Sequence, residues 1–267
     1  MFESGLWESD REFFHFCYLV TDGHKDRDPK LHAMRDTGGA MWLGGEMNRH
    51  GYVFAGPIFN HAADPNGPRR PRMDKKRLRN RLRRGKVVLV TTRPALSDRK
   101  FGDRKQIRRS YTLLERIIFR KVVRPWLTEC ARSQILLTDR AAAVSPEVKK
   151  RQTIIFRQHG DPKIQACGAI EDTVKWEQPE DGSTVAFLLY LEELWNGGPA
   201  VVVAWAQDGP TTMVWCRKLA TEFRHLLFSS PFVMAELRPG PPAPRAESID
   251  FADAWETRIL GVAKHAA

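Results

Sequence analysis

Three aspartates stand at positions where a sheet could use them for chemistry. Asp22, Asp139 and Asp208 each lie two residues beyond the end of an apolar run that is predicted to be a strand. Ligands of open α/β sheets bind outside the carboxyl ends of the strands, so parallel strands would bring these carboxylates to one rim. Carboxylates there could hold Mg²⁺ or Mn²⁺ for phosphoryl chemistry. One hypothesis is therefore a divalent-metal-dependent nuclease or phosphotransferase with these three aspartates as catalytic residues.

Candidate phosphate-binding groups accompany the aspartates. Arg93 and Arg140 follow two of the predicted strands and could clamp phosphate oxygens, and Thr211 and Thr212 begin a predicted helix whose free N–H groups favour anions. The same residue types are also ordinary turn and cap residues, so the rim has a purely structural interpretation as well. No P-loop, dinucleotide-binding glycine fingerprint, H-E-x-x-H or G-x-S-x-G motif is present, and the sequence does not identify a set of metal ligands.

The positive charge of the chain is concentrated in one segment. Residues 69–124 contain 22 Lys or Arg and four acids, a net charge of +18, whereas the whole chain carries +11 and the remainder therefore carries −7. Such a concentration of cations creates a local field of several kT and attracts polyanions, nucleic acid first among them. Nucleic-acid binding is therefore the leading functional prediction.

Twelve residues of this segment are predicted to contact nucleic acid: Arg69, Arg70, Arg72, Lys75, Lys76, Arg77, Arg79, Arg81, Arg83, Arg84, Arg104 and Arg108. Aromatic residues are absent between Arg69 and Lys100, so stacking platforms for single strands are not evident in that stretch. Phosphate contact with duplex or structured RNA fits better, and the choice between DNA and RNA stays open. The alternatives are a solvated helix face, or a scaffold or assembly subunit that binds an acidic protein partner.

Residues 74–85 are predicted to form a narrow amphipathic helix. Leu78 and Leu82 make an apolar i,i+4 seam, which is the spacing of one helix face. Like-charged residues such as Lys75 and Arg79 share that spacing, and each such pair opposes the helix by roughly 0.2–0.5 kcal/mol. We expect this helix to be marginal alone and to become firmer on a phosphate backbone.

The remaining pattern predicts a mixed α/β fold with a mostly buried sheet and helices on both faces. Continuous apolar runs at 184–191 and 200–206 are typical of interior strands. Further strands are predicted at 13–20, 86–90 and 231–237, and further helices at 103–129 and 211–228. The order strand, helix, strand from 200 to 237 predicts a parallel crossover. The glycine-rich residues 38–45 are predicted to form a hairpin, with a phosphate-contacting loop as the alternative.

The chain is expected to divide into three parts. Residues 1–238 are predicted to be a single α/β domain with an inserted basic segment at 67–110, followed by a Pro-rich linker at 239–247. Residues 248–267 are predicted to be a C-terminal helix with Trp255 and Ile259 on its apolar side. This helix could dock on a second copy and make a homo-oligomer.

Composition sets the outer bounds of these predictions. The 267 residues are 42% hydrophobic, enough for a full-sized core, and the longest apolar runs are far shorter than a membrane span of ~20 residues. No secretory signal is visible at the N-terminus, and the four cysteines form no C-x-x-C pair. We therefore expect a cytoplasmic protein with no membrane partner and reduced thiols.

Overall fold

The structure is a computed structural model, and it describes most of the apolar body of the chain. The described residues are 11–19, 29–61, 75–91, 113–123, 126, 153–157, 164–166, 169–171, 173–177, 179, 181–206, 209–240 and 254–263.

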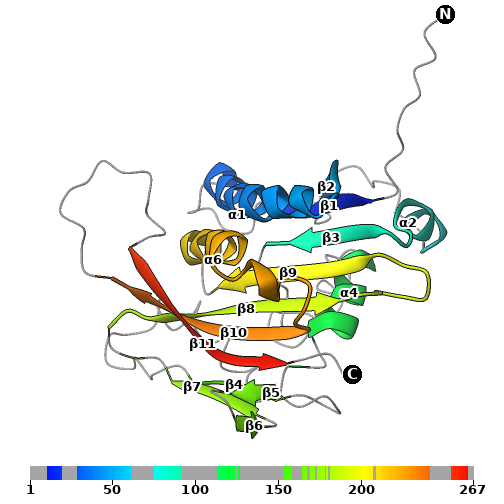
Figure 1. Cartoon of the computed structure of the whole chain (residues 1–267). Helices are drawn as coiled ribbons and strands as arrows, with labels where there is room; N and C mark the ends of the chain where they lie inside the picture. The colour runs from blue at the N-terminus through cyan, green and yellow to red at the C-terminus, as the bar shows by residue number, and fades with distance from the viewer. Residues whose placement is uncertain are drawn as a thin grey trace, which may run out of the picture.

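A nine-stranded mixed sheet forms the body of the protein, with the order β2-β1-β3-β9-β8-β10-β11-β5-β6 (Figure 1). Its strands are β1 (Glu12–Leu19), β2 (Val53–His61), β3 (Lys86–Val90), β5 (Ile164–Ala166), β6 (Ala169–Glu171), β8 (Thr184–Leu191), β9 (Ala200–Ala206), β10 (Phe232–Pro239) and β11 (Trp255–Ala263). Strands β2, β1, β3 and β9 pair in parallel, and every pairing from β9 through β8 to β6 is antiparallel. The predicted α/β class is confirmed. Two further strands, β4 (Thr153–Arg157) and β7 (Thr173–Glu177), form a separate antiparallel pair.

The helices of the described chain are α1 (Pro29–Arg49), α2 (Lys75–Arg81), α4 (Leu113–Ile118) and α6 (Gly209–Thr221), with a π-helical turn η1 (Phe119–Val123) and a 3₁₀ turn η3 (Arg224–Leu226). Helix α6 connects β9 to β10. Both of these strands are antiparallel to β8, which lies between them, so they are parallel to each other and the predicted crossover is confirmed.

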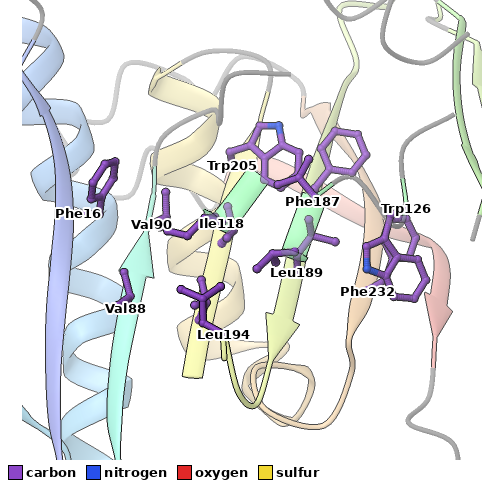
Figure 2. Packing of buried hydrophobic residues seen from close by; sticks show 14 of the residues in the cluster. Phe16, Val88, Val90, Ile118, Trp126, Phe187, Leu189, Leu194, Trp205 and Phe232 are labelled. Carbon is purple, nitrogen blue, oxygen red and sulfur yellow. The ribbon is translucent and has the colours of Figure 1, made fainter. Parts of the chain in front are cut away.

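Successive residues of the central strands enter two different buried clusters. Val88 and Val90 of β3 pack in a cluster with residues of α2, α4 and η1, whereas Val87 and Leu89 pack in a cluster with residues of α1 and α6. This alternation follows from the period of two along a strand, which points neighbouring side chains to opposite faces. Figure 2 shows the first cluster, in which Trp126 stacks on Phe232 with ring centroids 4.9 Å apart.

The glycine-rich residues 38–45 are helical, and the hairpin predicted there is wrong. They lie inside α1, and an added Cβ at Gly39 would lie 3.1 Å from Cys216 Sγ of α6. A Cβ at Gly44 would lie 3.2 Å from the ring of Phe13 on β1. The glycines therefore let α1 approach α6 and the sheet closely, a requirement of tertiary packing that turn propensity does not reveal.

The predicted C-terminal helix is also wrong. Residues 255–263 form strand β11, which pairs with β10 along its length and with β5 at Val262 and Ala263. The burial of Leu260 and Ala263 against the sheet outweighs the helical spacing of the apolar residues. The helix expected to mediate a homo-oligomer is therefore a strand of the main sheet. Within the proposed Pro-rich linker, residues 241–247 lie outside the described residues.

The described part of the basic segment 67–110 contributes a strand to the main sheet. Strand β3 belongs to it and lies in the middle of the parallel part of the sheet, between β1 and β9. The segment therefore carries part of the core as well as the charge.

We expect Leu82→Ala to lower the free energy of unfolding by about 2–5 kcal/mol, because Leu82 is 0% exposed in the cluster beneath α2. Urea denaturation checks this value. The exposed neighbour Asn80 supplies the matched control, and Asn80→Ala should change the stability by less than about 0.5 kcal/mol. Equal effects of the two substitutions would contradict the anchoring of α2 in the core.

Candidate functional site

Helix α2 places a row of cations on the surface of the body. Leu78 and Leu82 are 3% and 0% exposed and hold the helix against the cluster of Ile118 and Leu194. The cationic side chains of residues 75–84, which we call the cationic face, are all exposed: Lys75, Lys76, Arg77, Arg79, Arg81, Arg83 and Arg84. A helix is confirmed, but it covers Lys75–Arg81 and not the predicted 74–85; both leucines of the predicted seam are buried, and Leu82 lies one residue past the end of the helix.

The cationic face is only partly neutralised by the protein itself. Arg84 lies 3.9 Å from Glu193, and its side chain remains 85% exposed. The Arg81 guanidinium lies over the ring of Phe14, 5.3 Å from its centroid. Among the residues that the structure describes, no carboxylate lies within ion-pair distance of Lys75, Lys76 or Arg79. The positive charge of these side chains is therefore turned to solvent.

A second group of cations comes from α4 and η1. Leu114, Ile118 and Val122 follow one another at i,i+4 spacing and are buried in the core cluster. Arg116, Arg120 and Lys121 are exposed on the other side. Residues 103–112 of the predicted helix lie outside the described residues.

The two groups of cations meet across an open pocket of about 440 Å³. Its walls are Lys75, Leu78 and Arg79 of α2, Leu113, Arg116 and Ile117 of α4, Arg120 and Lys121 of η1, and Leu194 and Trp195 of the β8–β9 loop. Figure 1 shows α2, α4 and the β8–β9 loop at the same end of the sheet. Five of the ten lining residues are cationic and none is acidic, so the electrostatic potential in the pocket is positive and attracts anions.

The loop between β8 and β9 holds Trp195 in a defined place at this pocket. The backbone N–H of Gly198 donates to the Trp195 carbonyl oxygen at 2.6 Å. An added Cβ at Gly198 would lie 2.7 Å from Nε1 of the indole, so only glycine fits beneath the ring. The indole is half-buried and packs against the core cluster that contains Leu194.

Sequence reasoning missed four residues of this pocket: Arg116, Arg120, Lys121 and Trp195. The three cations belong to the +18 segment, but nothing in their spacing distinguishes them from solvated helix residues. Trp195 lies more than 70 residues further along the chain, and only the pairing of β9 with β3 brings its loop to α2. A Trp beside Asn-Gly-Gly-Pro is otherwise the ordinary content of a hairpin loop.

Two of the three strands behind the aspartate prediction are observed, β1 before Asp22 and β9 before Asp208, whereas the run before Asp139 lies outside the described residues. Strands β1, β3 and β9 run in the same direction, so Leu19, Val90 and Ala206 end at one rim. Asp22, Asp139 and Asp208 lie outside the described residues, as do Arg93 and Arg140 of the predicted phosphate clamp. The same holds for five of the predicted nucleic-acid contacts: Arg69, Arg70, Arg72, Arg104 and Arg108.

The two threonines at the rim are buried. Thr211 is 6% and Thr212 3% exposed, and the Thr212 hydroxyl accepts a hydrogen bond of 2.9 Å from the Ala206 N–H. This bond ties the start of α6 to the end of β9, which is the structural role of a turn residue. Phosphate contact by Thr211 and Thr212 stays a prediction.

One buried polar pair bridges β1 and β3 near the rim. His15 Nε2 and Thr91 Oγ1 lie 2.9 Å apart in a hydrogen bond, and both residues are buried. Burial lowers the pKa of His15 to about 4, so its imidazole is neutral at neutral pH. The pair lies between β1 and the end of β3. In the order of the sheet, β2 lies on one side of β1 and β3 lies on the other. Such a switch in strand order is the point at which open α/β sheets place ligands.

The cationic pocket and the rim lie at opposite ends of the parallel strands. Helix α2 leads into the amino end of β3, and the loop of Trp195 leads into the amino end of β9. Strand β3 has five residues, and at roughly 3.3 Å per residue it separates the two ends by about 16 Å. A ligand held on the cationic face therefore does not lie at the carboxyl ends unless it spans the sheet.

The described part of the chain lacks two other kinds of functional feature. It contains no group of three or more His, Cys, Asp or Glu side chains that could hold a metal ion. None of its helices has the length and apolar character needed to cross a membrane.

We expect the stability of the protein to fall in acid through His15. The pKa of His15 is about 4 in the folded chain and 6.5 in the unfolded chain. Between these values the unfolded chain binds a proton that the folded chain does not, so this stability is complete above pH 6.5 and is lost as the pH falls. Between pH 7 and pH 4, the unfolding free energy measured in urea should fall by about 3 kcal/mol less for His15→Gln than for the unsubstituted protein. An NMR titration that places His15 near pH 6.5 would contradict its burial.

Comparison of the chain with family models, with curated proteins and with solved structures found no match.

Proposed function

We propose that this protein binds nucleic acid through its cationic face and the cationic pocket beside it. The observation that carries the proposal is the convergence of α2 with α4 and η1, which lines one pocket with five cations and no acid. Sequence neighbours alone do not produce this arrangement, because α2 and α4 are separated by more than 30 residues. The fold therefore gathers the positive charge instead of dispersing it.

The chemistry of the face fits a phosphate backbone. Cations that neutralise phosphates release condensed counterions, which drives binding and makes it steeply dependent on salt. Like charges at i,i+4 on α2, such as Lys75 and Arg79, repel each other by roughly 0.2–0.5 kcal/mol per pair, and a polyanion relieves that repulsion. The exposed arginines can also pair with phosphate oxygens in bidentate geometry.

The alternative functions have no comparable support in the described part of the chain. Divalent-metal chemistry at the carboxyl rim stays a prediction, because the aspartates that would perform it lie outside the described residues. An acidic protein partner would use the same cations. It differs from nucleic acid in its salt dependence, because a protein carries no dense row of phosphates with condensed counterions to release.

The double substitution Lys76→Gln with Arg83→Gln tests the proposal. Both residues are exposed and neither lines the pocket, so the fold and the pocket should remain. We expect weaker binding to labelled DNA and RNA, and a log–log salt slope that is smaller by about 2. Fluorescence anisotropy over a salt series measures both quantities.

The matched control removes two exposed arginines from elements outside the cationic face. Arg49 ends α1, where it pairs with the buried Glu46 at 2.9 Å, and Arg224 begins η3, so Arg49→Gln with Arg224→Gln lowers the net charge by the same amount, and an unchanged urea midpoint checks that losing the Glu46 pair leaves the fold intact. The control should leave affinity and slope nearly unchanged. If both pairs reduce binding equally, net charge alone is responsible and the cationic face is not the binding surface.

A further inference from the structure

We infer that the pocket beside α2 holds one unpaired nucleotide of the bound strand, with its base stacked on Trp195 and its phosphate among the surrounding cations. This inference rests on the proposed nucleic-acid binding and assigns it a specific site. It follows from three properties of the pocket: its aromatic wall, its charge and its size.

Trp195 supplies a prepared aromatic surface. Its indole is half-buried, packs against the core cluster of Leu194, and lines the pocket. Figure 2 shows Leu194 in the same cluster as Ile118 of α4, so the loop is anchored to the element that carries the opposite cations. Gly198 leaves the space that the indole edge occupies, because an added Cβ there would lie 2.7 Å from Nε1, and Gly197 adopts a left-handed backbone with φ +69° that suits a tight loop. A ring held in this way loses little freedom when a base stacks on it.

The cations of the pocket surround that aromatic surface. Lys75 and Arg79 come from α2, and Arg116, Arg120 and Lys121 come from α4 and η1. An aromatic platform next to clustered Lys and Arg is the combination that single-stranded nucleic-acid sites use, because the base stacks while the phosphate is neutralised. Apolar side chains of Leu113 and Ile117 complete the wall and favour an aromatic base over a bare inorganic anion.

The size and form of the pocket favour one nucleotide over a duplex. Its volume of about 440 Å³ lies in the range of small-ligand pockets, roughly 300–1,000 Å³. A paired base inside a duplex already stacks on both faces, so it cannot stack on Trp195 without leaving the helix. The site therefore selects strands with unpaired nucleotides, and the phosphates next to the bound nucleotide lie along the cationic face.

The first test measures the binding of Trp195→Ala to three probes: single-stranded dT12, an abasic deoxyribose-phosphate strand of the same length, and a DNA duplex. We expect the affinity for dT12 to fall about 5- to 150-fold, because that is the usual effect of removing one stacking residue. Affinity for the abasic strand and the duplex should hardly change, because neither presents a free base. An rU12 strand should behave as dT12 does, since every base has a stacking face.

Two further variants separate stacking from folding. Trp195→Leu keeps an apolar side chain against the core but has no aromatic face, so it should lose dT12 affinity as Trp195→Ala does, with an unchanged urea midpoint. Trp195→Phe should restore most of the affinity. Arg116→Gln should weaken dT12 and the abasic strand equally, because it removes a phosphate contact, whereas Arg224→Gln on η3 should weaken neither.

The outcomes distinguish this inference from the function on which it rests. If Trp195→Ala and Trp195→Leu leave dT12 binding unchanged while Lys76→Gln with Arg83→Gln weakens every probe, the nucleotide site is wrong and the proposed function stands. If none of these variants affects any probe, both are wrong. If uridine 5′-monophosphate binds as tightly as rU12 and loses its binding in Trp195→Ala, the ligand is a free nucleotide and the strand assignment is overturned.

Discussion

The burial of Leu78 and Leu82 is the interaction on which the candidate site depends. Helix α2 has seven residues and several like charges, and an isolated helix of that length is unstable in water. Burying a leucine contributes roughly 1.5–3 kcal/mol, whereas each like-charge pair opposes the helix by only about 0.2–0.5 kcal/mol. The two leucines therefore outweigh the repulsion and hold the cations in place before any anion arrives. A preorganised face loses less conformational entropy when it binds.

The same buried cluster joins the parts of the pocket that come from distant segments. Leu78 of α2, Leu82 just past its end, Ile118 of α4 and Leu194 of the β8–β9 loop all belong to it, although the segments lie far apart in the chain. Each segment buries an apolar residue in this cluster and presents a cationic or aromatic residue to the pocket. Core packing and the lining of the pocket thus use different positions of the same short elements. This arrangement also explains why the pocket lies at the amino ends of β3 and β9, where α2 and the loop enter the sheet.

The opposite end of the parallel strands has a different character. There the polar groups that the structure describes are buried and bonded to one another, as His15 is to Thr91 and as the Ala206 N–H is to Thr212. Such satisfied buried groups fix the geometry of the strand ends and the start of α6. The close contact of Gly39 with α6 brings α1 over the same region. The sheet therefore separates a tightly packed rim from a solvated cationic end.

The sequence by itself determined the features that follow from local pattern: the apolar strands β1, β3, β8, β9 and β10, the α/β class, the seam of Leu78 and Leu82, and the concentration of charge. Tertiary structure decided what local pattern could not. Glycines in α1 reflect close helix packing and not a turn, and the apolar spacing of residues 255–263 suits a strand because β10 offers a partner. The pocket is the clearest case, because Trp195 meets the cations of α2 only through strand pairing. Pairing over such distances is set by the global burial of apolar surface, which no single segment encodes.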